Sequence, residues 1–195
     1  MADFPEKIRA FIALRMSAEV ESAIADLVGQ LREHRSGIRW ARPSNLHLTL
    51  RFLGDRVEHG LLVQIDKSLR QIASQTSPFV LNARGTGAFP NQDRPRVIWI
   101  GLVNEQLMRL ARQVEDAAVE AGFAAEARPY TPHLTIGRTR DLRGWHDVRP
   151  ILDSHSEHDF GSSLIGEMTL YRSILGGEAS QYVALARYPF TATQP

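Results

Sequence analysis

The chain has 195 residues, 43% of them hydrophobic, which is enough to bury a sizeable core, and we expect one compact unit over residues 1–195. Its 23 basic and 22 acidic residues nearly balance, which excludes nucleic-acid binding through a strong global field and leaves local basic patches as the means of contact. Cysteine is absent, which excludes disulfides and thiolate chemistry; with the acidic residues in 1–6 and no membrane-length apolar stretch, this predicts a cytoplasmic protein without membrane contact.

The first half of the chain predicts the order strand, helix, strand. A β-prone run covers residues 8–14, and a helix with Ser17 as its N-cap follows, with apolar positions at helical spacing as far as Leu31. A turn over residues 43–45 leads into a strand that begins at His47 and ends near Leu53.

The second half repeats this order. A helix over residues 57–73 separates the halves, and a strand from residue 79 continues toward Gly85 and Gly87, where glycine favours a bend or bulge. A strand over 97–103, a helix over 104–121 and a strand from His133 then follow. This duplication predicts two α+β lobes related by a pseudo-two-fold axis, with a cleft between them.

The C-terminal part of the chain predicts a hairpin of two strands, residues 168–175 and 182–190, around Gly176 and Gly177. Residues 140–158 are polar and rich in His and Asp, and for them we expect a mobile loop with one helical turn.

One short phrase occurs in both halves at corresponding places: His-Leu-Thr-Leu at 47–50 and His-Leu-Thr-Ile at 133–136. On a strand, successive side chains face opposite sides, so each phrase puts His and Thr on one face and two aliphatic residues on the other. A single such His is most simply a structural residue, but the repetition at matching positions favours a function. Two strands side by side would place two imidazoles across a cleft.

Histidine suits proton transfer because its ordinary pKa is about 6.5, so one imidazole can be neutral and the other charged near neutral pH. One ring could take a proton from water while the other gives a proton to a leaving oxygen. The hydroxyls of Thr49 and Thr135 could donate hydrogen bonds to phosphate oxygens, although threonine is common in any strand.

Two arginines follow the histidines. Arg51 lies four residues after His47, so strict alternation places it on the face of His47 and Thr49, as a phosphate clamp or as a solvated edge charge. Arg138 lies five residues after His133 and would point away from that face unless the strand is irregular at Gly137, which we therefore predict.

Other side chains near the motifs could contact RNA. Tyr130 and Phe89 could stack on a terminal base, or could simply pack in the fold. A basic rim for an RNA backbone is a further possibility, with scattered surface charge as the alternative, and its members would be Arg39, Arg42, Arg94, Arg96 and Arg128.

The segments 45–54 (NLHLTLRFLG) and 132–138 (PHLTIGR) resemble the two signatures of the 2H phosphoesterase superfamily, and within it the bacterial RNA 2',3'-cyclic phosphodiesterases, also called 2'-5' RNA ligases. The segments 87–90, 94–99 and 170–173 agree, so the resemblance covers almost the whole chain. It implies a bilobal α+β fold with antiparallel-rich sheets lining a central cleft and helices outside. Gly137 stands where many relatives carry alanine.

The resemblance also implies an activity: opening of the 2',3'-cyclic phosphate of an RNA end to a 2'-phosphomonoester, and in some members reversible, ATP-independent 2'-5' joining. It would make His47 the general acid on the leaving 3' oxygen, His133 the base that activates water, and Thr49, Thr135 and Arg138 the phosphate anchors. The partners would be RNA with a cyclic phosphate end or cyclic nucleotides. We expect a monomer that needs neither a cofactor nor a metal.

Two alternatives stay open. A non-catalytic module that binds RNA ends would use the same cleft without turnover. A metal-dependent hydrolase would join the two histidines to further ligands, although no HExxH-type spacing is present in the sequence. Those ligands would come from His146, Asp147, His155, His158 and Asp159.

Overall fold

The structure is a computed structural model that describes residues 7–176 and 180–193. Within them the strands are β1 (Lys7–Leu14), β2 (Ile38–Trp40), β3 (Leu48–Glu58), β4 (Phe79–Phe89), β5 (Val97–Val103), β6 (His133–Thr139), β7 (Asp159–Ile165), β8 (Glu167–Ile174) and β9 (Gln181–Pro189). The helices are α1 (Ala18–Glu33), α2 (His59–Gln75), α3 (Glu105–Glu120) and α4 (Trp145–Ser154), with a short 3-10 helix at Pro43–Asn45.

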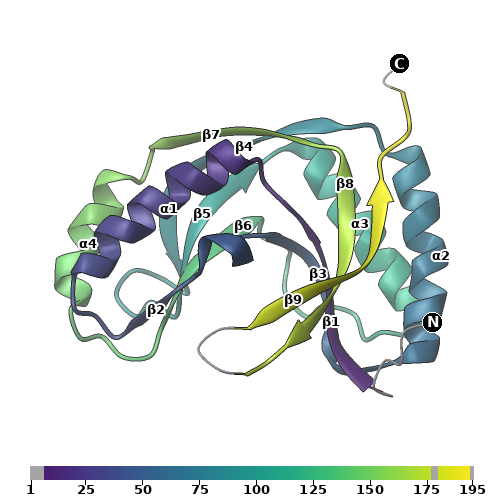
Figure 1. Cartoon of the computed structure of the whole chain (residues 1–195), viewed down its shortest axis with the longest axis horizontal. Helices are drawn as coiled ribbons and strands as arrows, with labels where there is room; N and C mark the ends of the chain where they lie inside the picture. The colour runs from purple at the N-terminus through teal and green to yellow at the C-terminus, as the bar shows by residue number, and fades with distance from the viewer. Residues whose placement is uncertain (1–6, 177–179, 194–195) are drawn as a thin grey trace.

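All the strands belong to one antiparallel sheet, which runs in the order β7-β4-β5-β6-β3-β1-β8-β9. The short strand β2 pairs with residues 137–139 of β6, beyond the point where β6 pairs with β3. The two His strands, β3 and β6, are neighbours in the middle of this sheet (Figure 1). They share a single residue pair, Leu48 with Leu134, and both side chains are fully buried in the core. The sheet therefore consists of two half-sheets that meet at one point.

The helices cover the half-sheets in an exchanged manner. Helix α1 follows β1 in sequence but contacts β7 of the other half-sheet, near α4, which contacts β4. Helix α3 follows β5 but packs on β3, beside α2, which also contacts β9. Figure 1 accordingly shows α1 with α4 at one end of the molecule and α2 with α3 at the other. The helix of each strand-helix-strand repeat, α1 or α3, thus packs on the half-sheet that contains the strands of the other repeat.

The repeated order strand, helix, His strand is confirmed, and so are the two helix starts that have a polar cap. Ser17 accepts a hydrogen bond from the backbone N–H of Val20, and Asn104 accepts one from the N–H of Leu107 at 3.0 Å. The α+β class with an antiparallel sheet is confirmed as well. The single bilobal domain over residues 1–195 stays a prediction, which the continuous sheet supports.

The expectation of a mobile loop over residues 140–158 is wrong. This segment contains the helix α4, and β7 begins directly after it. Helix α4 buries Trp145, Val148 and Leu152 at helical spacing, and the Trp145 indole N–H donates to the carbonyl of Gln92 at 2.9 Å. Its polar composition and the internal Pro150 hide this apolar stripe in the sequence. Strand β7 was not predicted.

The tail hairpin is confirmed as β8 and β9, while Gly177 of its expected turn and the N-terminal residues 1–6 lie outside the described residues.

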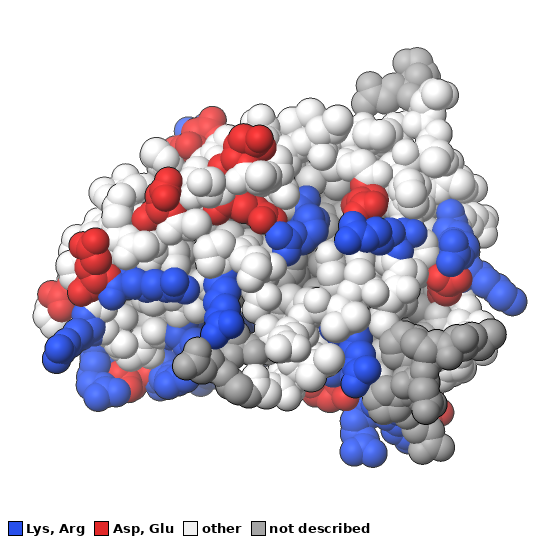
Figure 2. Space-filling model, in the orientation of Figure 1, with Lys and Arg blue, Asp and Glu red and all other residues white. Residues whose placement is uncertain are grey.

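No helix in the described ranges combines the length and the apolar character that a bilayer crossing requires. Figure 2 shows acidic side chains gathered along α1, with basic side chains spread over the rest of that face. The near-neutral balance therefore conceals local differences in charge.

Candidate active site

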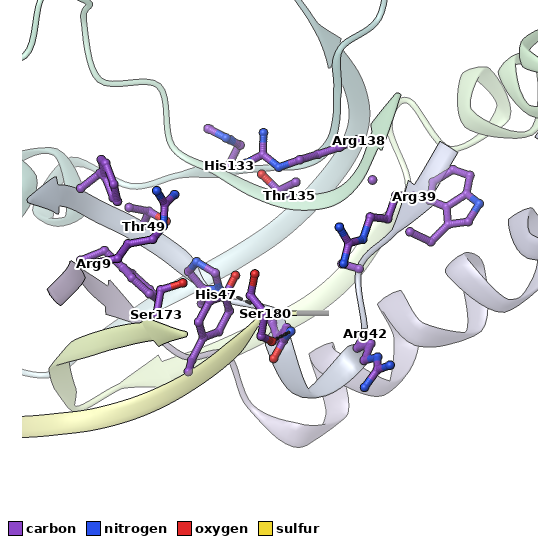
Figure 3. Close-up of a pocket in the computed structure, with 17 residues that line it drawn as sticks. Arg9, Arg39, Arg42, His47, Thr49, His133, Thr135, Arg138, Ser173 and Ser180 are labelled. Atoms are coloured by element: carbon purple, nitrogen blue, oxygen red, sulfur yellow. Dashed lines mark hydrogen bonds between the residues drawn. The ribbon is translucent and has the colours of Figure 1, made fainter. Parts of the chain in front are cut away.

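The two histidines lie at the point where the half-sheets meet. His47 directly precedes β3 and His133 begins β6, each one residue before the shared pair of leucines. Because the pair is antiparallel, extending its register by one residue sets His47 across from Thr135 and His133 across from Thr49. Leu48 and Leu134 point into the core, so these four side chains share the opposite face. All four line one cavity (Figure 3).

A bulge in β6 brings Arg138 to the same face. Gly137 pairs with Ile98 and Thr135 pairs with Trp99, so Ile136 is the extra residue on β6. One extra residue reverses the alternation, and Arg138 then points with Thr135. Figure 3 shows Arg138 extending toward His133 at the edge of the cavity that it lines. The irregularity predicted at Gly137 is confirmed, and its register shift falls on the residue before the glycine.

A matching bulge in β3 removes Arg51 from the cleft, so the expectation that it shares the face of His47 and Thr49 is wrong. Ile12 pairs with Arg51 and its successor Ala13 pairs with Thr49, which leaves Leu50 as the extra residue. Arg51 therefore points to the core side, where it is 6% exposed. Its guanidinium forms ion pairs with Glu115, at 2.6 Å, and with Glu126, and donates to the carbonyl of Ala124. Arg51 ties β3 to α3 and to the segment before His133.

We expect Arg51→Met to lower the free energy of unfolding by about 3 kcal/mol, because it leaves two carboxylates without their partner around a largely dehydrated position. The loss stays at the low end for a buried ion pair since the Glu115 and Glu126 side chains are 28% and 51% exposed. Chemical denaturation measures it. Arg143→Met, which removes the exposed pair with Asp141, is the control and should change stability by less than about 0.5 kcal/mol. Equal effects of the two variants would contradict the role of burial.

The two imidazoles are held in the same way. Nδ1 of His47 is 2.6 Å from the carbonyl oxygen of Asn45, and Nδ1 of His133 is 2.7 Å from that of Thr131. A carbonyl oxygen accepts and never donates, so Nδ1 carries the hydrogen in both rings. Nε2 of each ring is then the nitrogen that can accept or give a proton in the cleft.

Burial lowers the pKa of both histidines. For His47 the pKa falls to about 4, because burial and the positive charges of Arg15 and Arg138 outweigh the hydrogen bond to Asn45. For His133 burial also lowers the pKa, with Arg138 adding to it and the carbonyl of Thr131 opposing it. Both rings are thus neutral near pH 7 in the free protein. An acid role for either ring requires a bound anion that raises its pKa.

The cavity has a volume of about 380 Å³, within the range of small-molecule sites. Sequence reasoning missed part of its wall, which β1, β2, β3, β8, β9 and the residues just before β3 and β9 supply. The missed residues are Arg9, Phe11, Trp40, Ala41, Asn45, Phe52, Ser173, Ser180 and Tyr182. Phe11 and Tyr182 surround the His47 ring, with centroids 4.8 and 5.0 Å away. Arg9 and Phe11 are two residues apart in a β-prone run, the spacing of one strand face, and this was a usable signal, but the tail hairpin is too distant in sequence to be placed.

Tyr130 and Phe89 do not line this cavity. The Tyr130 hydroxyl donates to the carbonyl of Thr49 at 3.0 Å, so it joins the segment before β6 to β3, and burial raises its pKa. Phe89 meets the His133 ring edge-on at 5.1 Å and packs on Trp99. Both residues support the site from outside the cavity, a position that gives no support to their expected stacking on a base.

The basic rim is partly assembled. Arg39 and Arg42 line the cavity, and Figure 3 shows Arg39 turned into it and Arg42 turned outward. The remaining three rim candidates, Arg94, Arg96 and Arg128, do not line it.

The residues that a metal site would add lie on α4 and just after it, where His155, His158 and Phe160 pack together. Over residues 7–176 and 180–193, no three His, Asp or Glu side chains converge in a way that could hold a metal ion.

Fold and site together define a two-histidine phosphoesterase. The profile of the family described as LigT like Phosphoesterase matches residues 14–99 and again 100–176, so each repeat carries one copy. The chain therefore belongs to the LigT-like phosphoesterase family.

Curated relatives carry a more particular name. The chain is 33% identical over 170 residues to the RNA 2',3'-cyclic phosphodiesterase of Methanothermobacter thermautotrophicus, covering 87% of this chain and 91% of the relative. It is 34% identical over 169 residues to the enzyme of the same name from Archaeoglobus fulgidus, covering 86% and 92%.

Solved structures agree with the fold. A crystal structure of TT0787 from Thermus thermophilus has a TM-score of 0.79 at 26% identity, covering 96% of this chain and all of that one. E. coli LigT complexed with 3'-AMP has a TM-score of 0.71 at 25% identity, with the same coverage.

Proposed function

We propose that this protein opens the 2',3'-cyclic phosphate at an RNA 3' end, leaving a 2'-phosphomonoester, by acid-base catalysis with two histidines. The observation that carries the proposal is the pair of imidazoles whose Nδ1 atoms are both fixed by backbone carbonyls, which leaves both Nε2 atoms for one cavity. The curated relatives named RNA 2',3'-cyclic phosphodiesterase support the substrate.

The reaction needs one proton removed and one supplied. One Nε2 accepts a proton from water as the water oxygen attacks phosphorus, and the other Nε2 donates a proton to O3' as the P–O3' bond breaks. The family pattern makes His133 the base and His47 the acid. The low pKa of His47 in the free protein means that the bound phosphate anion must raise it for this assignment to hold.

The phosphate gathers negative charge on its non-bridging oxygens in the transition state. Thr49 lies across from His133 and Thr135 lies across from His47, so the hydroxyl of each threonine can donate a hydrogen bond to one of these oxygens. Arg138 adds a fixed positive charge on the same face. The same geometry admits the 5' hydroxyl of a second RNA in place of water: its oxygen would attack phosphorus as the P–O3' bond breaks, O3' would take the proton, and the product would be a 2'-5' phosphodiester formed without ATP.

The test is hydrolysis of adenosine 2',3'-cyclic phosphate and of a short RNA with a cyclic phosphate end, with product identified by its 2' or 3' position. We expect 2'-phosphate from both substrates, and equal rates with and without EDTA. Tight binding of the RNA end without turnover would favour the binding module instead, and loss of turnover in EDTA would favour the metal-dependent hydrolase.

The pH dependence should differ between the free enzyme and its complex. Activity requires one protonated and one neutral histidine, and both pKa values are lowered in the free protein. The acid histidine therefore loses its proton early as pH rises, and kcat/KM should decline from a pH below 6.5. The bound phosphate anion favours the imidazolium, so the decline of kcat should lie at higher pH. A kcat/KM that stays constant from pH 6.5 to 8 would contradict this.

A further inference from the structure

The two His strands carry different residues at one matching position in the cleft. Phe52 follows His47 by five residues and comes after the bulge at Leu50, just as Arg138 follows His133 by five residues and comes after the bulge at Ile136. Both side chains line the cavity. The half that contains β3 thus has an aromatic ring where the other half has a guanidinium.

The neighbouring strand brings a guanidinium to that ring. Arg9 of β1 lines the cavity, and its Cζ lies 4.4 Å from the centroid of the Phe52 ring, a cation-π arrangement. An ion pair with Asp55 on β3 holds it further. Arg9 is also the cross-strand neighbour of Ser173, a buried serine that lines the cavity. Figure 3 shows Arg9 on the Thr49 side of the cavity, across from Arg138.

Arg9 and Arg138 differ in what their charges reach. Arg138 lowers the pKa of both catalytic histidines, whereas Arg9 is not among the charges that act on either ring. The charge of Arg138 therefore acts where the two imidazoles face the cavity. Arg9 lines the same cavity on the side of Thr49.

We propose that Arg9, held on Phe52 and Asp55, is a second phosphate subsite that binds the phosphodiester on the 5' side of the terminal nucleoside. The proposal rests on the proposed function and narrows its substrate to an oligonucleotide end in preference to a cyclic mononucleotide. A guanidinium can donate two parallel hydrogen bonds to one phosphate, and the exposed carboxylate of Asp55 can move into water when the phosphate takes its place. The hydroxyl of Ser173 is a further donor beside it.

Three substrates with one reacting group test the subsite. They are adenosine 2',3'-cyclic phosphate, the dinucleotide ApA with a 2',3'-cyclic phosphate end, and the same dinucleotide with an uncharged methylphosphonate in place of its internal phosphodiester. For the wild-type protein we expect kcat/KM to be about tenfold higher with the charged dinucleotide than with the uncharged one.

Arg9→Gln should reduce that tenfold preference to within about twofold, and Arg9→Lys should retain part of it because the charge remains. Arg70→Gln is the matched control: Arg70 also pairs with a carboxylate, Asp66, and lies over an aromatic ring, that of Tyr188, but α2 does not line the cavity. It should keep the full preference. The salt dependence gives a second readout, since the slope of log kcat/KM against log salt for the charged dinucleotide should fall by about 0.7 in Arg9→Gln.

The outcomes are distinct. Wild-type turnover of all three substrates at equal kcat/KM overturns the subsite but leaves the proposed function intact. An equal loss on all three in Arg9→Gln also overturns it, because Arg9 would then act on the reacting phosphate or on the fold. Failure of the wild-type protein to open any of the cyclic phosphates overturns the proposed function, and the subsite with it.

Discussion

Replacement of either cleft histidine with alanine is expected to lower kcat by a factor of about 10²–10⁴, the usual contribution of a positioned proton donor or acceptor. Both rings present Nε2 to the same cavity, and neither neighbouring threonine can take over proton transfer at neutral pH. Steady-state hydrolysis of the dinucleotide ApA with a 2',3'-cyclic phosphate end measures the effect. The double variant should be little worse than the more damaging single variant, because the two rings act in one concerted exchange.

The controls separate chemistry from folding. His146→Ala removes an exposed histidine of α4 and should leave kcat unchanged. His47 packs between Phe11 and Tyr182, so His47→Gln is made alongside His47→Ala to keep that space filled. Thermal unfolding verifies that each variant is folded. A folded His133→Ala variant with more than a tenth of the wild-type kcat would refute the two-histidine mechanism.

The second large effect is expected at Arg138. Arg138→Gln should lower kcat/KM by a factor of about 10²–10³, the usual cost of removing one preorganised group that stabilises developing negative charge. It should also raise the pKa of both histidines toward the ordinary value, because the positive charge of Arg138 lowers both. The pH profile of kcat/KM should then shift to higher pH, while the maximum value of kcat/KM falls.

Arg140→Gln is the control for this prediction. Arg140 lies two residues farther along and does not line the cavity, so its loss should change neither the height nor the position of the profile. Arg138→Lys should retain the low pH position, since its charge remains, but should lose rate because an ammonium cannot make the paired hydrogen bonds of a guanidinium. A normal rate in Arg138→Gln would show that the phosphate is held without it.

Much of this cleft is predictable from local sequence. The repeated His-x-Thr phrase identifies both histidines and both threonines, because the period-two alternation of a strand depends only on neighbouring residues. The starts of α1 and α3 are predictable for the same reason, since the caps Ser17 and Asn104 act within one helical turn. The bulge near Gly137 is predictable because a glycine stands where Arg138 must change face.

The bulge at Leu50 has no such signal, which is why the sequence places Arg51 in the cleft and the structure places it among Glu115 and Glu126. Nothing local marks Leu50, and the shift is visible in the pairing with β1, far away in sequence. The same holds for Arg9, Ser173 and Tyr182, which reach the cavity through strand neighbours. Helix α4 is hidden by its polar composition.

The exchange of helices between the repeats makes the duplicated halves mutually dependent. A fragment that ended after α2 would keep β1 and β3 but would lack α3, one of the two helices that contact β3, and its own α1 would have lost β7. Large apolar surfaces would face water on both pieces. Although the sequence repeats a motif, we expect that the chain cannot be divided between the two His strands into pieces that fold alone, because the position of each cleft imidazole depends on contacts from both repeats.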